Sequence, residues 1–423
     1  MKNICLYFQI HHPFSFQTFR FIEVGKSKSY YDDFRIEREI QDAVTKSYLP
    51  VNDFLLKLIH QSKGKLKLSF YISGTALDQF LMYAPMVLSS FRQLADTGQI
   101  EFLGGTASHS IASLAKRGDE FIHQIKLNKE RMEYYFGQKP LVFVNTDLLF
   151  TNQVGKLVAE SGYPMIITNG AKKILQWRSP NYIYSSENQK KINILFRNEV
   201  ISNELTFLLS NPKALKKPEG MEQLFSTLQT IRPEEPLANI YLNYLTLGGF
   251  GRVEKLLFFQ TFVSKITKNG TFSFSLPTEL SKEFGPVTQI GTDEPICWSE
   301  HFHSSYFPGN TLQVDALTQL FKLKKQTGTL GNANLQIDWQ YLQTSDHFHL
   351  MDENHPAYLD NGSNGGIYKS KYDAYINYMN ILEDFSQRLK AEEARKKFKP
   401  KIDRPIQNSK RTLANHQHHP IYE

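Results

Sequence analysis

The chain has almost no cysteine, and this scarcity already excludes one class of protein. Only Cys5 and Cys297 occur among 423 residues, too few for the disulfide framework of a small secreted scaffold. Long apolar runs are missing as well, since no stretch approaches the roughly 20 residues that a membrane helix needs. The apolar segment at residues 4–10 is too short for a signal peptide. We therefore expect a cytoplasmic protein that does not bind membranes.

Charge of one sign is also scarce outside the C-terminal end. The formal net charge is +7, but residues 390–423 hold nine Lys and Arg against four Asp and Glu, which leaves about +2 for the rest. Nucleic-acid binding needs a basic face on the folded body, so we expect no nucleic-acid partner. Residues 391–423 contain few large apolar side chains and are predicted to form a disordered basic tail.

The chain does contain a regular alternation of strand-like and helix-like segments. This alternation predicts βαβ units and an α/β fold with a parallel sheet, whose loops after the strands meet at one face. We expect an incomplete TIM-like (β/α)7 barrel. An open doubly wound sheet is the alternative, although no glycine-rich dinucleotide motif follows the first strand. Strands are expected at residues 4–10, 66–72, 100–103, 141–144, 165–168, 192–196 and 240–244, and helices at 52–61, 76–97, 120–136, 152–161, 221–230 and 252–267.

The pattern changes after about residue 285. Residues 311–324 and 372–389 are typical of helices, and the segments between them are rich in Gly, Asn and Asp, which favour loops. We therefore expect a barrel at residues 1–285, a small helical C-terminal region at 286–390 that completes the cleft, and the tail at 391–423.

Two strand ends suggest a chemistry. Residues 144–150 read VNTDLLF and residues 242–249 read LNYLTLGG, and barrel enzymes place catalytic side chains where strands end. Both segments resemble signature segments of glycoside hydrolase family 57, the α-amylase-like group. In that family a Glu nucleophile stands at the position of Asp147, and an Asp general acid/base stands at the position of Asn243. The resemblance implies a (β/α)7 barrel that takes α-glucan or maltooligosaccharide as its ligand.

Further matching segments extend the resemblance over residues 1–390. They end with residues 338–348, DWQYLQTSDHF. In residues 101–110, Gly105 and Ala107 replace a Glu and a Tyr of close relatives, which predicts a cavity or a looser loop. Purely structural roles remain as alternatives to ligand binding. These are a strand-end cap for His11, core packing for Trp298, and an ion pair or helix cap at residues 346–347. By the resemblance, the residues that border the sugar are His11, His109, Trp298, Glu300, Asp346 and His347.

The two substitutions change what such a site can do. A retaining glycosidase needs two carboxyl groups about 5–5.5 Å apart. Asp147 has a shorter reach than Glu, and a misplacement of about 1 Å can cost roughly 100-fold in rate. The amide of Asn243 does not deliver a proton near neutral pH. We expect a catalytically impaired relative that acts in glucan binding or regulation, with other glucan-metabolising enzymes as candidate partners.

Two alternatives remain, so whether the chain is an enzyme stays open at this point. One is an active glycoside hydrolase or glucanotransferase that uses Asp147 with a non-standard second carboxylate, such as Asp346 or Glu300. The other is a metal-dependent polysaccharide deacetylase on a similar barrel, which would need an Asp and two His around a metal. The His-x-x-x-His spacing expected for it is absent, and we expect neither a metal nor another cofactor.

Overall fold

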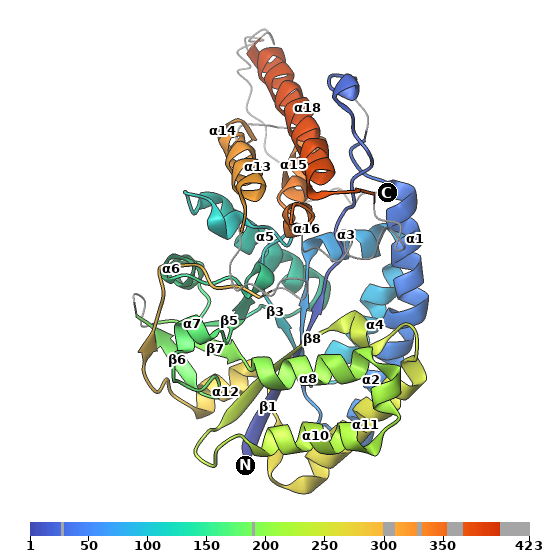
Figure 1. The fold of residues 1–423 in the computed structure, drawn as a ribbon, viewed down its shortest axis with the longest axis vertical. Coiled ribbons are helices and arrows are strands. Elements are labelled where there is room, and N and C mark those ends of the chain that lie inside the picture. The colour runs from blue at the N-terminus through green and yellow to red at the C-terminus, as the bar shows by residue number, and fades with distance from the viewer. Residues whose placement is uncertain (27–28, 188–190, 299–308, 328–331, 353–366, 398–423) are drawn as a thin grey trace, which may run out of the picture.

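The computed structural model describes residues 1–26, 29–187, 191–298, 309–327, 332–352 and 367–397. Within them, seven parallel strands close into a barrel in the order β1, β2, β3, β4, β5, β7, β8 and back to β1 (Figure 1). The narrowest links are single residue pairs, Gly104 with Phe143 and Arg197 with Asn239. The predicted (β/α)7 barrel is confirmed, and the open sheet was the wrong alternative. The strands are β1 (Lys2–Ile10), β2 (Leu68–Ile72), β3 (Ile100–Leu103), β4 (Val142–Val144), β5 (Met165–Asn169), β7 (Asn193–Arg197) and β8 (Leu237–Asn243).

Three shorter strands extend the barrel wall, and the sequence pattern did not predict them. β6 (Ile183–Ser186) runs antiparallel to β7, β10 (Gln289–Ile290) pairs with β6, and β9 (Phe272–Phe274) pairs with β1. They are two to four residues long, too short for an alternating pattern to distinguish them from loops.

Helices cover the outside of the barrel. One prediction about them is wrong: residues 76–97 form two helices instead of one. Pro85 begins the second helix, and the preceding Ala84 is not helical, with φ −153° and ψ 59°. Proline lacks an N–H and clashes with the carbonyl four residues before it, so a continuous helix breaks here. The helices around the barrel are α1 (Asp33–Ala43), α2 (Leu49–Gln61), α3 (Gly74–Tyr83), α4 (Pro85–Ala95), α5 (Asp119–Phe136), α6 (Asn152–Glu160), α7 (Lys172–Leu175), α8 (Glu199–Ser210), α9 (Pro212–Leu215), α10 (Pro218–Gln229), α11 (Arg252–Asn269) and α12 (Pro277–Glu283).

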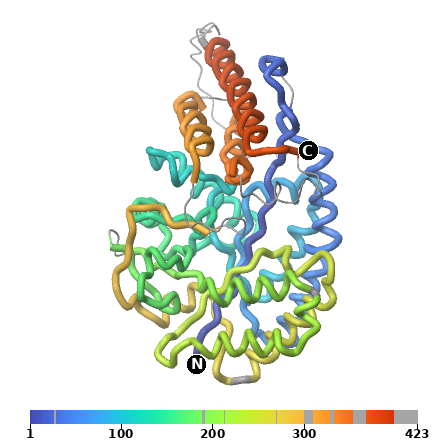
Figure 2. Tube along the Cα trace, in the orientation of Figure 1, coloured from blue at the N-terminus to red at the C-terminus, as the bar shows by residue number. Residues whose placement is uncertain are grey.

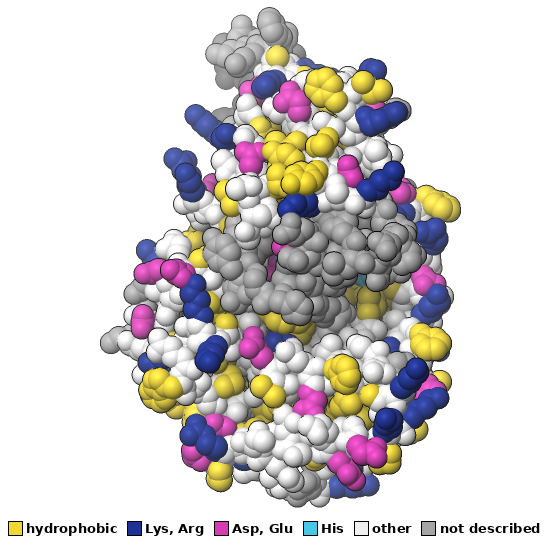
Figure 3. Space-filling view, viewed as in Figure 1, with side chains coloured by type: hydrophobic (Ala, Val, Ile, Leu, Met, Phe, Trp, Pro, Cys, Tyr) yellow, Lys and Arg dark blue, Asp and Glu magenta, His cyan; other side chains and the backbone are white. Residues whose placement is uncertain are grey.

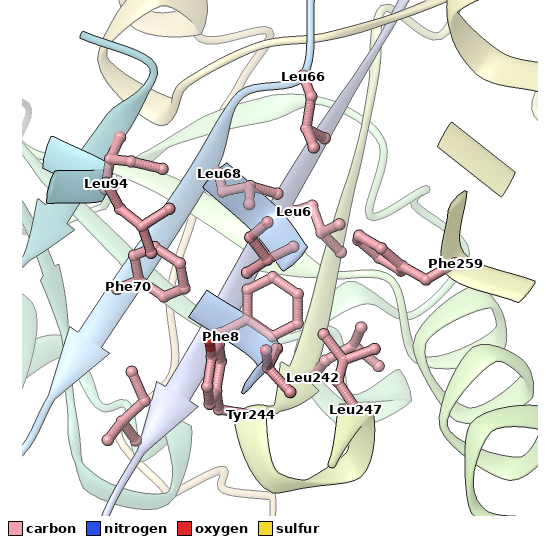
Figure 4. Packing of buried hydrophobic residues seen from close by; sticks show 14 of the residues in the cluster. Leu6, Phe8, Leu66, Leu68, Phe70, Leu94, Leu242, Tyr244, Leu247 and Phe259 are labelled. Carbon is pink, nitrogen blue, oxygen red and sulfur yellow. The ribbon is translucent and has the colours of Figure 1, made fainter. Parts of the chain in front are cut away.

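Alternating side chains along each strand build two layers of core. On β1, Leu6 and Phe8 point outward, and the Phe8 ring lies 5.7 Å from that of Phe70 and 6.3 Å from that of Phe259 (Figure 4). Tyr7 has the opposite parity and belongs to the cluster inside the barrel. Because strand side chains alternate between the two faces, residues with the parity of Tyr7 point into the barrel. Where such a residue lies at the carboxyl end of a strand, its side chain points into the barrel mouth.

The C-terminal helices stand over the carboxyl ends of the strands (Figure 1). Single bridges from Ser110 to Thr344 and from Phe150 to Ile296 join them, and the segment before them, to the loops after β3 and β4. This arrangement brings α16 to the mouth of the barrel. These helices are α13 (Thr311–Lys322), α14 (Lys324–Thr327), α15 (Ala333–Leu342), α16 (Ser345–His349) and α18 (Lys371–Lys397).

The helical region also includes a segment from near the N-terminus. Residues 14–26 run beside α18 (Figure 2), where the Phe19 N–H donates to Asn377 at 2.6 Å and the Tyr30 hydroxyl donates to Asp384 at 2.6 Å. The expected domain boundary at residue 285 places this segment with the barrel, whereas its contacts are with the C-terminal helices. The contacts join residues more than 350 positions apart, a distance over which local sequence patterns carry no information.

The C-terminal boundary also differs from the expectation. α18 continues to Lys397, so residues 391–397 are helical rather than part of a disordered tail. This stretch reads AEEARKK, whose residue types have high helix propensity. Residues 398–423 lie outside the described residues. Acidic and basic side chains are interspersed over the described face in Figure 3. No helix among the described residues is long and apolar enough to cross a bilayer.

Candidate functional site

Polar side chains converge where three strands end at the mouth of the barrel. His11 follows β1, His109 lies in the loop after β3, and Asp147 lies in the turn after β4. Asp346 and His349 reach them from α16. Three of these residues belong to segments about 200 or more positions from the α16 pair, so the closed barrel and the helices above it create the cluster together.

Asp147 is held in an unusual backbone conformation. Its φ is +53° and that of Leu148 is +52°, a region that non-glycine residues adopt rarely and at a cost of about 1–3 kcal/mol. The Trp298 N–H donates to the Asp147 carbonyl oxygen at 2.7 Å, and the Leu148 N–H donates to that of Asn145 at 3.0 Å. These backbone bonds stabilise a turn that points the Asp147 carboxylate toward α16.

Two histidines surround the carboxylate of Asp147. His349 Nε2 lies 2.7 Å from Oδ2, and His109 Nε2 lies 3.9 Å from Oδ1. Burial opposes ionisation of this carboxyl group, but the charge and hydrogen bond of His349 outweigh it, so the pKa of Asp147 falls below its usual value. The same pair raises the pKa of His349 against the effect of burial. The contact between Asp147 and His349 therefore favours the ionised form of the carboxyl group and the protonated form of the imidazole.

Asp346 is the second carboxylate of the cluster, and it has its own histidine. His11 Nε2 lies 2.7 Å from Asp346 Oδ2, and His11 Nδ1 lies 2.9 Å from the Ser73 hydroxyl. Ser73 also caps α3 by accepting a hydrogen bond from the Ala76 N–H at 3.2 Å. Burial opposes ionisation of Asp346, but His11 and its neighbouring imidazoles hold its pKa well below the usual range.

Stacked imidazoles connect the two carboxylates. The rings of His11 and His109 have centroids 4.0 Å apart and an interplanar angle of 30°. His109 Nδ1 lies 3.1 Å from the Tyr71 hydroxyl. Burial, with the neighbouring His11, lowers the pKa of His109 to about 3, so His109 is neutral near pH 7. Asp147 and Asp346 thus lie at opposite ends of a histidine stack.

Asn243 ends β8 on the same rim. It pairs in register with Gln9 of β1, and its parity matches that of the inward-facing Tyr241. Its side-chain oxygen accepts a hydrogen bond from the Leu245 N–H at 3.0 Å and so caps the short helical turn η5 (Tyr244–Leu247). Among the described residues no hydrogen bond or ion pair joins Asn243 to Asp147 or Asp346.

Comparison with known proteins agrees with this architecture. The family described as Glycosyl hydrolase family 57 matches residues 5–292. This chain belongs to that family. A protein of Methanocaldococcus jannaschii named "Putative alpha-amylase" is 29% identical over 382 residues, which is 87% of this chain and 80% of that protein.

Solved structures of the family share the fold. The alpha-amylase AmyC from Thermotoga maritima matches with a TM-score of 0.64 at 12% identity, over 92% of this chain and 94% of that one. A family 57 branching enzyme from Thermococcus kodakaraensis, in complex with glucose and additives, matches with a TM-score of 0.67 at 12% identity, over 94% and 91%. The family membership and α-amylase-like character implied by the sequence are thus confirmed.

Trp298 lies near the mouth in this family 57 barrel and packs on a buried cation. The Arg197 guanidinium lies 4.4 Å from the centre of the Trp298 ring, and the Tyr241 ring lies 4.6 Å away. Arg197 is fully buried. A role for Trp298 in sugar binding stays a prediction. The same contacts also agree with the alternative that Trp298 packs in the core. Glu300 lies outside the described residues.

His347 is separated from the cluster although it follows Asp346 directly. It is buried, its ring stacks on Phe16 with centroids 3.8 Å apart, and its Nε2 lies 3.1 Å from the Tyr341 carbonyl oxygen. Successive helical residues point about 100° apart, so Asp346 faces the mouth while His347 enters the helical core. Its predicted contact with the ligand stays a prediction.

The sequence reasoning missed His349 and Tyr71. His349 lies three positions after Asp346 on α16, and residues at this spacing share a helix face, which was an available signal. Tyr71 occupies the space where the loss of larger side chains predicted a cavity or a looser loop. A Cβ added at Gly105 would lie 2.2 Å from Cε2 of the Tyr71 ring. The expected cavity is therefore filled.

The described part of the chain was also expected to show whether histidines and acids gather as metal ligands do. No group of three or more His, Cys, Asp or Glu side chains there is placed to hold a metal ion. The imidazoles of His11 and His349 instead hydrogen-bond to carboxylates.

Proposed function

We propose that this chain binds an α-glucan at the mouth of its barrel and hydrolyses it slowly or not at all. The observation that carries the proposal is that each carboxylate of the cluster lies 2.7 Å from an imidazole nitrogen, Asp147 from His349 and Asp346 from His11. The pKa values of Asp147 and Asp346 both lie below the usual range because imidazoles surround them. Neither carboxyl group holds a proton near neutral pH, and position 243 carries an amide.

Glycoside hydrolysis needs a proton donor beside the leaving oxygen. In most glycosidases one carboxylic acid with a raised pKa supplies that proton. The cluster contains an ionised carboxylate at the nucleophile position, so one of the two required groups is present. Asn243 cannot replace the acid, because an amide does not transfer a proton to the leaving oxygen. It can still form a hydrogen bond with a sugar oxygen. Binding can therefore persist where catalysis is impaired.

The proposed ligand class rests on the family and its named members. Relatives are named as an alpha-amylase and a branching enzyme, and the latter was solved with glucose. The mouth offers groups suited to sugar hydroxyls, namely the carboxylates of Asp147 and Asp346 and the rim amide of Asn243. A regulatory or scaffolding role beside other glucan-metabolising enzymes follows if binding occurs without turnover.

A second candidate function is an active hydrolase or glucanotransferase with a rebuilt site. The observation that favours it is that Asp147 is ionised, as a nucleophile must be, and that Asp346 belongs to the same cluster. Asp346 would have to act as the acid, which its lowered pKa opposes. This reading therefore requires the ligand to raise the pKa of Asp346 on binding.

The decisive experiment measures binding and turnover on the same purified protein. Maltoheptaose, amylopectin and glycogen are assayed for release of reducing ends and chain transfer, beside affinity electrophoresis on the same glucans. Asp147→Ala is the site variant, and Asp53→Ala, at an exposed position on α2, is its control. Binding without turnover supports the proposal. Turnover that only Asp147→Ala abolishes supports the rebuilt enzyme, and neither binding nor turnover contradicts both.

A double variant separates loss of two groups from wider loss of the site. Asp147→Glu with Asn243→Asp restores the residue types of the family at both positions. We expect little recovery of hydrolysis, because Tyr71 fills the space beside Gly105 where relatives carry a larger polar side chain. Recovery to the rates of active relatives would show that the remaining contacts are intact.

A further inference from the structure

A tryptophan is exposed on the surface just after α7. Trp177 is 85% exposed, in the segment that follows β5 and α7. A pocket of about 290 Å³ adjoins it, lined in part by its neighbours Gln176 and Arg178. We propose that Trp177 and this pocket form a second α-glucan contact, distinct from the carboxylate cluster, that holds a longer chain of the ligand. This inference rests on the proposed function.

The turn that carries Trp177 is strained but firmly held. Gln176 has φ +57° and ψ −108°, a conformation that a non-glycine residue adopts only where its surroundings enforce it. Its N–H donates to the Lys172 carbonyl oxygen at 2.8 Å, and the Arg178 N–H donates to that of Leu175 at 2.9 Å. Leu175 is buried in the core beneath α7. The indole is thus exposed on a fixed support.

The indole also has a defined neighbour on one side. The Arg178 guanidinium lies 5.2 Å from the centre of the Trp177 ring, within the range of a cation–π contact. This contact restricts the side chain while leaving most of its surface open to solvent. A pre-oriented, exposed aromatic face costs little conformational entropy when a flat apolar ligand surface stacks on it.

The pocket beside this turn is pre-formed and has a lining of polar and apolar residues. Its wall includes Lys172, Arg178 and Glu199, and its floor includes the buried Asn181 and Asn198. The Asn198 amide donates to Asn181 at 2.8 Å, and the Asn181 amide donates to Glu235 at 2.9 Å. Hydrogen-bond donors and acceptors line the pocket, together with side chains of both charge signs. Such a mixture suits a neutral ligand with many hydroxyl groups better than a simple anion.

Hydrogen bonds connect this pocket to the mouth. Glu199, in the pocket wall, accepts from the Asn169 amide at 2.8 Å, and the same amide lies 3.2 Å from the Cys297 carbonyl oxygen. Cys297 precedes Trp298, whose N–H donates to Asp147. This series of contacts links one wall of the pocket to the backbone of the carboxylate cluster, as expected for two contacts of one extended chain.

The test compares long and short glucans on the full chain. Trp177→Ala should weaken binding to glycogen and amylopectin by roughly tenfold, the upper range for an aromatic contact. The short glucan maltotriose, which we expect to occupy the mouth alone, should bind unchanged. Trp177→Tyr should keep most of the long-chain affinity. Tyr134→Ala removes another highly exposed aromatic side chain, 78% exposed on α5, and should change neither affinity.

Each outcome has a distinct meaning. If the unsubstituted protein binds no glucan, the proposed function fails and this inference fails with it. If it binds glycogen and Trp177→Ala binds it equally well, only the second contact is wrong. A Trp177→Ala loss that is equal for maltotriose and glycogen also overturns it, because the indole would then belong to the mouth. Circular dichroism spectra that match across the variants verify that the fold is intact.

Discussion

The mouth and the floor of the barrel each bury a carboxyl group, and the two groups differ in charge. At the mouth, Asp147 lies among imidazoles and its pKa is lowered. At the floor, Glu101 of β3 accepts hydrogen bonds from the N–H and hydroxyl of Thr278 at 3.2 and 2.9 Å. Burial there dominates and raises the pKa of Glu101 to about 7. Burial is common to both places, so it is the partners that determine the charge.

The two places should respond to pH with opposite signs. A lowered folded-state pKa contributes stability that is present above the unfolded pKa and is lost as pH falls. Asp147 and Asp346 therefore stabilise the fold at neutral pH and lose that contribution in acid. A raised folded-state pKa contributes stability that is present at low pH and is lost as pH rises, so Glu101 acts in the reverse direction between about pH 4.5 and 7.

The largest expected effect comes from removing the partner at the mouth. His349→Ala leaves Asp147 buried and without its 2.7 Å contact, and breaking a buried pair costs about 3–5 kcal/mol. We expect a loss of this size at pH 7 in urea unfolding, and a smaller loss at pH 4, where Asp147 can take up a proton. His123→Ala, at an exposed position on α5, should be neutral. An equal loss at both pH values would mean that packing, and not charge, explains the effect.

The expected pH dependence at the floor of the barrel is tested by replacing Glu101 with a residue that does not titrate. Glu101→Gln should abolish the part of the pH dependence that Glu101 causes, on the order of 3 kcal/mol across its pKa shift. The measurement is the free energy of unfolding at pH 5, 6, 7 and 8 for both proteins. Their difference should change in favour of the Gln variant up to about pH 7 and level off above it. A constant difference would show that Glu101 stays ionised or is reached by solvent.

An intermediate effect on stability is expected from a substitution just after β3, the strand that carries Glu101. Gly105 follows β3 with the same inward parity as Glu101, and a Cβ there would lie 2.2 Å from the Tyr71 ring. Gly105→Ala should destabilise the fold by about 1–3 kcal/mol through overpacking and displace Tyr71 from His109. Gly285→Ala, where a Cβ meets nothing within 4 Å, is the matched control. An unchanged stability for Gly105→Ala would show that the ring moves away freely.

The smallest effect concerns the cap at the end of β8. Asn243→Ala removes the side-chain acceptor for the Leu245 N–H and should cost about 1 kcal/mol. Asn243→Asp keeps an acceptor and should preserve stability. Thermal unfolding of both variants measures the difference. If the Ala variant is as stable as the parent, the cap does not explain why an amide stands here.

Much of the fold could be predicted because it depends on local periodicity. The seven barrel strands were expected within a few residues of their positions; β7, for example, was placed at 192–196 and found at Asn193–Arg197. α1 was missed because it is mostly polar and buries only Ile36 and Ile40. The contacts of Asp147 could not be predicted in detail, because His349 lies 202 positions away and no local pattern reports such a meeting.

The sequence alone established the barrel, the resemblance to family 57, and the amide at position 243, because periodicity and residue identity are written in the chain. The three-dimensional arrangement established what those residues can do. A carboxyl group is ionised or neutral according to its burial and the charges within a few ångströms of it. Folding brings His349 to Asp147 and His11 to Asp346, while Glu101 accepts hydrogen bonds from Thr278 and lies near the like charge of Glu279. These neighbours, gathered from distant segments, shift the pKa values of similar acids in opposite directions.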